Sequence, residues 1–235
     1  MKVLLVSINA KYIHTNNAVR LLKANSSFNP EILEYTIKDD IDEIIQVINS
    51  KQVDVIGFSV YIWNVGLIIK IIEKLDLEGS KLILGGPEVS YEPSHFLIND
   101  KVDFIIKGEG EVVFNELLTH LDNKTSYEYL DNLSFKKNNK LYHNPIVEID
   151  NLSIVKPPYY FEEDKNHIPN KIAYIESSRG CPYKCSYCLS SLEKRVRFFD
   201  IEGVKNAIMY LMENGARTIK FLDRTFNANR QTMEI

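Results

Sequence analysis

Cysteine is almost missing from this sequence of 235 residues: positions 1–180 contain none, and all three cysteines lie between positions 181 and 188. An odd number of cysteines in one short cluster excludes a disulfide framework and indicates a metal site in a reducing compartment. The sequence also lacks an apolar run of the roughly 18 residues that a membrane span needs. Its first residues become polar too soon for a signal peptide. We therefore expect a cytoplasmic protein with no membrane partner.

A basic excess is missing as well, since 28 Lys and Arg stand against 32 Asp and Glu, for a net charge of −4. This balance argues against a nucleic-acid partner. With 45% hydrophobic and 26% charged residues, the composition is that of an ordinary globular protein, which excludes intrinsic disorder. The length allows one large domain or two small ones.

Strand-like and helix-like patterns alternate over the first 124 residues. Short apolar runs, typical of strands buried on both faces, alternate with stretches in which apolar residues recur at helical spacing. Two of the helices have a candidate cap, Asp40 or Asn64. The predicted strands are residues 3–8, 31–37, 54–60, 81–84 and 102–106, and the predicted helices are residues 16–25, 41–48, 65–77, 92–99 and 111–121. This order predicts an α/β fold for residues 1–124, a Rossmann-like doubly wound parallel sheet.

The pattern changes over residues 125–170. Two short runs, 133–137 and 140–144, are separated by two asparagines and predict a hairpin. Prolines follow at 145, 157, 158 and 169 and predict an extended linker. The α/β rhythm then restarts over residues 171–235, with predicted strands at 171–177 and 218–222 on either side of a helix at 201–214. Residues 125–170 therefore separate two domains.

The three cysteines have the spacing C-x3-C-x2-C, at Cys181, Cys185 and Cys188. Three thiolates on one compact loop can hold three irons of a cubane cluster, and the fourth iron is left open for a substrate or cofactor. One alternative is a zinc site completed by His167 or His143, and another is a set of packing cysteines. Zinc knuckles usually bring pairs at C-x2-C spacing, so the spacing favours the cluster.

The cysteine loop resembles the signature of the radical S-adenosylmethionine (SAM) enzymes, with Tyr187 before the last cysteine and Ser-Arg-Gly before the first. The resemblance implies a [4Fe-4S] cluster on Cys181, Cys185 and Cys188, whose open iron chelates SAM and cleaves it reductively to a deoxyadenosyl radical. It also implies an electron donor such as flavodoxin or ferredoxin. Tyr187 would support the adenine of SAM. Asp223, at the end of a strand, would contact its amino group, the alternative being a cap on the next turn.

Two basic residues after the cysteine loop also resemble positions of that family. Arg195 and Arg197 would pair with the SAM carboxylate or form a solvated face.

Unusual residues collect where the predicted strands of the first domain end, and parallel sheets bind ligands at that edge. Neither G-x-G-x-x-G after the first strand nor a P-loop motif occurs, which excludes those two nucleotide sites. The stretches 55–59, 84–88 and 107–111 instead resemble the cobalamin (B12)-binding domain that precedes many radical SAM barrels. The resemblance implies that a pocket for cobalamin is lined by Ser59, Gly85, Gly86, Gly108, Glu109 and Gly110.

The first loop departs from that family. Many cobalamin domains carry D-x-H-x-x-G there, with the His as lower cobalt ligand, whereas residues 9–16 have no Asp-x-His and only a displaced His14. His14 is thus either a cobalt ligand or a residue of the loop surface. A domain that keeps the fold without the cofactor is a further alternative.

These resemblances predict a cobalamin-dependent radical SAM enzyme that methylates or rearranges an unactivated carbon of a small molecule or peptide, with no catalytic side chain of its own assigned. A methylthiotransferase is one alternative, and the lack of cysteine in residues 1–180 argues against it. A non-catalytic cobalamin-binding or structural module with a vestigial cluster loop is another. A full eight-unit barrel takes about 250 residues, so residues 171–235 predict only the start of a partial barrel. We therefore expect a fragment that binds cobalamin without completing the SAM site.

Overall fold

All seven residues of the first strand, β1 (Val3–Asn9), are buried. A computed structural model describes residues 1–193, 195–226 and 228. They form two units, the first from residues 1–12 and 18–148 and the second from residues 13–17 and the described residues after 148. The second unit therefore includes five residues from inside the sequence of the first.

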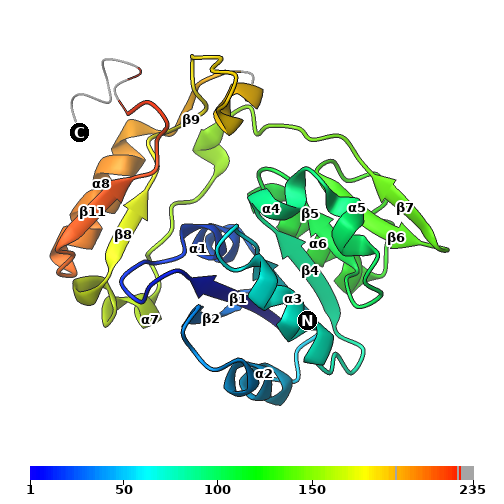
Figure 1. Cartoon of the computed structure of the whole chain (residues 1–235). Helices are drawn as coiled ribbons and strands as arrows, with labels where there is room; N and C mark the ends of the chain where they lie inside the picture. The colour runs from blue at the N-terminus through cyan, green and yellow to red at the C-terminus, as the bar shows by residue number, and fades with distance from the viewer. Residues whose placement is uncertain (194, 227, 229–235) are drawn as a thin grey trace. The chain divides into compact units, whose positions relative to one another are not determined.

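The helices and strands follow the predicted alternation (Figure 1). The first unit contains α1 (Asn17–Ala24), β2 (Glu31–Thr36), α2 (Ile41–Ser50), β3 (Val55–Ser59), α3 (Val65–Lys74), β4 (Lys81–Gly85), α4 (Pro87–Ser90), α5 (Pro93–Leu97), β5 (Phe104–Ile106), α6 (Glu111–Asn123), β6 (Leu133–Lys137) and β7 (Lys140–His143). The second contains η1 (Leu152–Ile154), α7 (Glu162–Lys165), η2 (Ile168–Asn170), β8 (Ile172–Ile175), β9 (Ser178–Arg179), η3 (Leu189–Leu192), β10 (Arg197–Phe198), α8 (Ile201–Glu213) and β11 (Thr218–Phe221).

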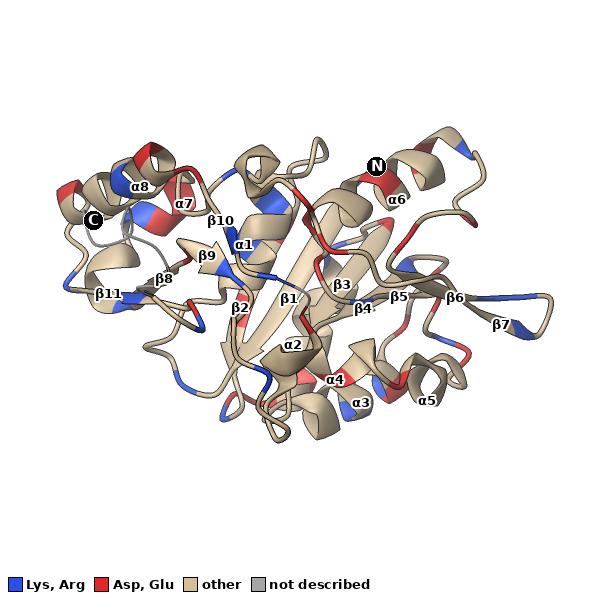
Figure 2. Ribbon diagram, turned by 90° about the horizontal axis from the view of Figure 1, so that it is seen from above, with Lys and Arg blue, Asp and Glu red and all other residues tan. Residues whose placement is uncertain are grey.

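One seven-stranded sheet organises the first unit, in the order β2-β1-β3-β4-β5-β6-β7. The first five strands are parallel, as predicted, and β6 and β7 are antiparallel to their neighbours. Figure 2 shows α1 and α6 on one face of this sheet and α2, α3, α4 and α5 on the other. Buried apolar side chains form a separate core on each face. The predicted α/β class is therefore confirmed.

The predicted hairpin forms, and it extends the sheet. Its strand β6 pairs with β5 through Phe104 and Phe135. Leu133 and Phe135 belong to the core on the α1 and α6 face. The hairpin thus covers the edge of β5 that the parallel strands leave open.

Two expected helix starts differ in their capping. The carboxylate of Asp40 accepts hydrogen bonds from the backbone N–H groups of Asp42 and Glu43, as predicted for the start of α2. Asn64 precedes α3 without capping it by its side chain. Its amide instead donates to the carbonyl oxygens of Ile8 (2.9 Å) and Ser59 (3.0 Å). It therefore ties the ends of β1 and β3 together.

The second unit contains one β-α-β element, in which β8 and β11 are parallel and α8 connects them. Its core combines side chains of both strands and of α8 with the buried ring of Tyr159. The strand–helix–strand order of residues 171–222 is the one that the sequence predicts. In the part of the chain that the structure describes, no helix has both the length and the apolar character of a membrane span.

Candidate cofactor site

The carboxyl ends of the parallel strands of the first unit are level with one another. The register pairs Ser7 with Ser59, Ser59 with Gly85, and Gly85 with Ile106. The sheet continues from β1 to β2 on one side and to β3 on the other, so the switch point where such folds bind ligands lies at β1 and β3. The predicted residues Ser59, Gly85 and Gly86 therefore lie on one edge, beside this point.

Gly86 holds the loops after β3 and β4 against each other. The backbone N–H of Val60 donates to the carbonyl of Gly85 at 2.7 Å. Gly86 has φ +117°, and a Cβ atom there would lie 2.4 Å from the carbonyl oxygen of Val60. Only glycine permits both this conformation and this approach.

The loop after β5 is connected to the loop after β4 by Ser90, a residue the sequence did not single out. The Ser90 hydroxyl donates to the carbonyl of Gly86 (2.8 Å) and accepts from the backbone N–H of Gly108 (3.1 Å). The carbonyl of Glu109 accepts from the side-chain amide of Asn132 at 3.2 Å, and Gly110 immediately precedes α6. The structure thus brings the predicted residues of β4 and β5 together.

An aromatic pair follows β3 at the switch point. The rings of Tyr61 and Trp63 are stacked, with centroids 4.5 Å apart. The indole N–H of Trp63 donates to the carbonyl of Ile8 at 3.2 Å, although 45% of this residue is exposed. Trp63 was not predicted, because a lone tryptophan in a loop has no spacing signal.

His14 lies in the second unit. Its Nδ1 atom is 2.6 Å from the hydroxyl of Tyr174, a residue of β8. The next residue, Thr15, donates its hydroxyl to the carbonyl of Ile172 at 2.9 Å and lies 2.8 Å from the hydroxyl of Tyr159. Side chains from residues 13–17 therefore contact the first strand of the second unit.

The three cysteines follow β9, and all of them are partly exposed. Gly180 has φ +93°, and a Cβ atom there would lie 2.1 Å from the carbonyl oxygen of Arg195, so this loop also depends on a glycine. Inside the loop, the N–H of Cys188 donates to the carbonyl of Cys185 at 3.1 Å. Lys184 donates to the carbonyl oxygens of Ser191 (3.0 Å) and Glu193.

The side chain of Cys181 contacts Thr225. Its Sγ atom lies 3.5 Å from the Oγ1 atom of Thr225. The hydrogen bond with Thr225, followed by a backbone hydrogen bond from Tyr183, lowers the pKa of the Cys181 thiol. A lower pKa favours the thiolate, which is the form that binds metals.

Asp223 follows β11 and binds the segment that leads to the cysteines. Its carboxylate accepts hydrogen bonds from the backbone N–H groups and the hydroxyls of Ser177 and Ser178. Both serines are buried, whereas Asp223 is half-buried. Asp223 therefore lies beside the start of the loop, and its hydrogen bonds with Ser177 and Ser178 tie that segment to the end of β11.

The other predicted contacts of SAM differ in exposure. Tyr187 is 91% exposed on the cysteine loop. Arg195 pairs with the carboxylate of Asp150. Arg197 is buried and donates to the carbonyl of Ile149 at 2.7 Å, so the expectation of a solvated face is wrong for this residue.

One histidine of the zinc alternative, His143, forms hydrogen bonds within the first unit. The ring nitrogens of His143 lie 2.9 Å from the Ser94 hydroxyl and 3.1 Å from the Ser134 hydroxyl, within the first unit. Among residues 1–193, 195–226 and 228, no three His, Cys, Asp or Glu side chains are arranged around one metal ion. A cubane cluster differs from a single ion, because each thiolate binds its own iron.

The residues present fit the implied cofactors in their donor chemistry. The cysteine loop supplies three partly exposed thiols, one of them with a lowered pKa, at the carboxyl end of two parallel strands. The first unit supplies a ligand-binding edge with close backbone approaches and a partly exposed aromatic pair. Neither set requires a residue that the described chain lacks.

Residues 3–118 match the family described as the B12 binding domain. The chain is 29% identical over 202 residues to an uncharacterized methyltransferase of Pyrococcus horikoshii, which covers 82% of this chain and 43% of that protein. It is 25% identical over 230 residues to the cobalamin-dependent radical SAM methyltransferase TokK of Streptomyces tokunonensis, which covers 92% of this chain and 33% of TokK. The chain thus spans less than half the length of either relative.

The fold is also found in solved structures. The cobalamin-dependent S-adenosylmethionine radical enzyme OxsB, with aqua-cobalamin bound, aligns with a TM-score of 0.79 at 19% identity. The alignment covers 96% of this chain and 34% of OxsB. The family match supports cobalamin binding, and the resemblance drawn from the two sets of motifs is confirmed. Residues 3–118 therefore form a B12-binding domain, in a chain whose relatives include a cobalamin-dependent radical SAM methyltransferase.

Proposed function

We propose that the chain belongs to a cobalamin-dependent radical SAM enzyme that transfers a methyl group to an unactivated carbon or rearranges its substrate. The observation that carries the proposal is the place of the C-x3-C-x2-C loop. It follows β8 at the carboxyl end of a parallel strand pair, in a chain whose first unit is a B12-binding domain. The carboxyl end of parallel strands is where α/β enzymes build their sites.

The residues of the first unit would hold cobalamin by shape. Gly85 and Gly86 leave the strand end bare of side chains, and Ser59 places a buried hydroxyl beside them. The stacked rings of Tyr61 and Trp63 offer an apolar surface at the switch point. Apolar faces with a few fixed polar groups are typical of cofactor sites.

The residues of the second unit would hold the cluster and orient SAM. Cys181, Cys185 and Cys188 would each bind one iron, and Asp223 would fix the approach to the loop through Ser177 and Ser178. When bound, the cluster supplies the electron that cleaves SAM and cobalamin supplies the methyl group. A flavodoxin or ferredoxin would reduce the cluster, and the substrate would be a small molecule or peptide.

Anaerobic reconstitution of the 235-residue chain tests the proposal. We expect about four irons per chain and the broad visible absorbance of an iron–sulfur cluster. A triple variant with all three cysteines changed to alanine should lose both, whereas Ser186→Ala, in the same loop, should keep both. The proposal fails if the triple variant retains the absorbance.

Cobalamin is tested separately by titration with hydroxocobalamin, followed by absorbance after gel filtration. Cofactor binding with no cluster would favour the alternative of a non-catalytic cobalamin module. Formation of 5′-deoxyadenosine from SAM, with dithionite as reductant, then reports whether this chain completes the SAM site.

A further inference from the structure

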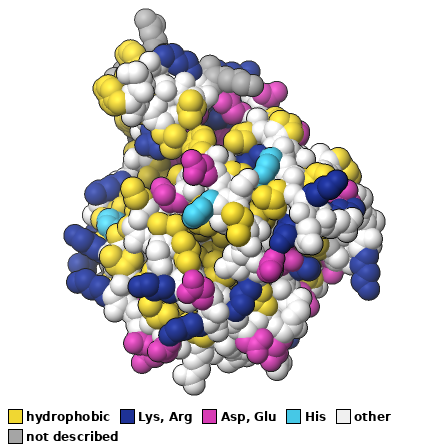
Figure 3. All heavy atoms as spheres, turned by 45° about the vertical axis from the view of Figure 1, so that its right-hand side comes forward, with side chains coloured by type: hydrophobic (Ala, Val, Ile, Leu, Met, Phe, Trp, Pro, Cys, Tyr) yellow, Lys and Arg dark blue, Asp and Glu magenta, His cyan; other side chains and the backbone are white. Residues whose placement is uncertain are grey.

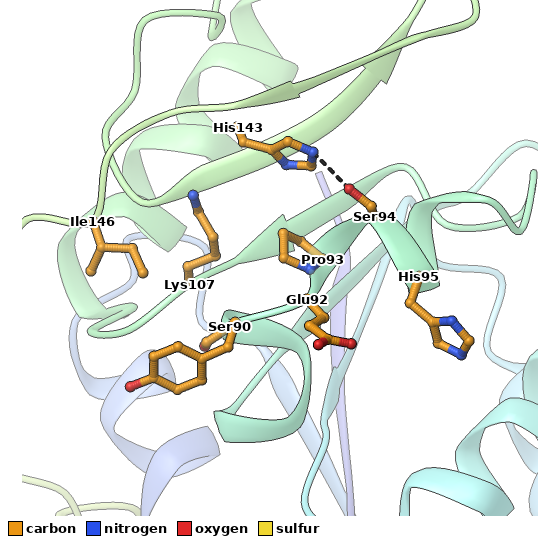
Figure 4. A pocket seen from close by; sticks show the side chains of 9 residues that line it. Ser90, Glu92, Pro93, Ser94, His95, Lys107, His143 and Ile146 are labelled. Atoms are coloured by element: carbon orange, nitrogen blue, oxygen red, sulfur yellow. Dashed lines mark hydrogen bonds between the residues drawn. The ribbon is translucent and has the colours of Figure 1, made fainter. Parts of the chain in front are cut away.

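The first unit carries a pocket of about 540 Å³ next to the loop after β5. Its walls come from the segment that connects α4 to α5, from the residue after β5, and from β7 with the segment that follows it (Figure 4). Figure 3 shows the side of the molecule turned forward from the right of Figure 1, where histidines lie among apolar and charged side chains. A pocket of this size accommodates an organic molecule rather than only an ion.

A buried lysine forms the floor of this pocket. Lys107 is only 6% exposed, and its ammonium group donates to one protein acceptor, the carbonyl of Asn144. No carboxylate in the described part of the chain forms an ion pair with it. Desolvation lowers the pKa of Lys107. Because a buried charge is costly without an opposite charge, this position favours an anion in the pocket.

The pocket wall near the amine of Lys107 also carries groups that can donate hydrogen bonds. His143 on β7 and Ser94 on α5 are joined at 2.9 Å from Nε2 to Oγ. In Figure 4 this pair lies on the same side of the pocket as the amine end of Lys107. The carboxylate of Glu92, which also lines the pocket, points away from that amine in the same view. The charge near the floor is therefore positive.

We propose that this Lys107 pocket binds the phosphate group of an organic phosphate. A lysine ammonium is a compact point charge with three N–H donors, and such a group commonly binds phosphate oxygens in proteins. Two sources carry such a group, the nucleotide phosphodiester of cobalamin and a separate phosphorylated small molecule. The first source rests on the proposed function, and the second goes beyond it because it requires neither cobalamin nor a cluster.

Calorimetric titration of the whole chain with ribose 5-phosphate tests the second source, and titration with hydroxocobalamin and with cobinamide, which lacks the nucleotide phosphate, tests the first. The variant is Lys107→Met, and the matched control is Lys140→Met, an exposed lysine on β7. Loss of a charge-assisted hydrogen bond should weaken binding roughly tenfold or more. Lys140→Met should leave each affinity within about twofold, because screened surface charges contribute little.

The affinities of Lys107→Met for the three probes distinguish the two sources of phosphate. Weaker ribose 5-phosphate binding by Lys107→Met supports a separate organic phosphate. Weaker hydroxocobalamin binding with unchanged cobinamide binding supports the cobalamin phosphate. Equal affinities of the wild type and Lys107→Met for all three probes, or no binding of any, overturn the proposal.

A third variant covers the case in which Lys107→Met fails to fold, as judged by circular dichroism. Lys107→Arg keeps the charge and should retain binding to within about tenfold, while His143→Gln should weaken it by severalfold. Full affinity in His143→Gln together with none in Lys107→Arg overturns the proposal. If hydroxocobalamin and cobinamide do not bind but ribose 5-phosphate does, the result counts against the proposed function only. The ribose 5-phosphate titration does not depend on cobalamin binding.

Discussion

The carboxylate of Asp223 accepts a 2.8 Å hydrogen bond from the hydroxyl of Ser178, so the end of β11 is tied to the first residue of β9. The same carboxylate accepts the backbone N–H groups of Ser177 and Ser178. Both donors come from buried serines just before the cysteine loop. One side chain thus satisfies several donors that would otherwise be buried without an acceptor.

Asp223→Asn should destabilise the second unit by about 1–3 kcal/mol, because an amide offers one acceptor oxygen and turns an N–H group toward other donors. Hydrogen exchange of the amides of β8 and β11 measures the effect. The control is Asp150→Asn, whose partner Arg195 is mostly exposed, and such exposed pairs contribute at most about 1 kcal/mol. Equal protection in both variants would contradict the structural role of Asp223.

Tyr159→Phe should also destabilise the second unit by about 1–3 kcal/mol. The hydroxyl of Tyr159, a residue only 1% exposed, accepts from the backbone N–H of Tyr174 at 2.7 Å and lies 2.8 Å from the Thr15 hydroxyl. Its loss leaves the Tyr174 N–H without this acceptor. Urea unfolding followed by far-ultraviolet circular dichroism measures the change.

The neighbouring Tyr160 supplies the control for that experiment. Tyr160 is 45% exposed, and its ring packs against that of Tyr210. Tyr160→Phe keeps this ring contact and should change stability by less than about 0.5 kcal/mol. A Tyr159→Phe midpoint equal to that of Tyr160→Phe would show that the buried network contributes nothing.

The sequence predicts the order of strands and helices because apolar runs and helical spacing are local signals. The helix α4 was missed, since its four residues from Pro87 are too few to show a period. The place of the hairpin in the sheet was also missed, because it depends on the pairing of Phe135 with Phe104, far apart in the sequence. Local patterns carry no information on such distant pairs.

The candidate site shows the same division. The loops around Gly86 and Gly108 were predicted from glycines at strand ends, which is a local signal. The roles of Ser90 and Asn64 were not, because their partners lie on other loops. Likewise, nothing near His14 in the sequence indicates that its neighbour Thr15 binds the backbone of β8.

Acid should destabilise the first unit in part through His143. Burial, and then the positive charge of Lys107, lower the pKa of His143 below its usual 6.5. As the pH falls below 6.5, the unfolded chain therefore takes up this proton first, and the stability of the folded state decreases. Glu92 and His95 line the same pocket.

His143→Gln removes this contribution while it keeps a polar side chain. The loss of stability between pH 7.5 and pH 5.5, measured by urea unfolding, should be smaller in the variant than in the wild type. His120→Gln, which changes a partly exposed histidine on α6 outside this pocket, is the control and should retain the wild-type loss. An equal loss in all three proteins would rule out the assigned effect of His143.

Gly86→Ala should destabilise the first unit and weaken cobalamin binding, because the added Cβ would lie 2.4 Å from the carbonyl oxygen of Val60 at a φ of +117°. Strain of this kind costs on the order of 1–3 kcal/mol. The control is Gly66→Ala in α3, where no atom lies within 4 Å of the new Cβ, and helix propensity should raise stability by about 0.5–1 kcal/mol.

Trp63, the one tryptophan of the sequence, lies in the loop after β3, so its fluorescence follows unfolding of this unit alone. Opposite shifts of the fluorescence midpoint in the two variants are expected, with hydroxocobalamin affinity lowered only by Gly86→Ala. Wild-type affinity and midpoint in Gly86→Ala would mean that the close approach of the two loops is not required for the site.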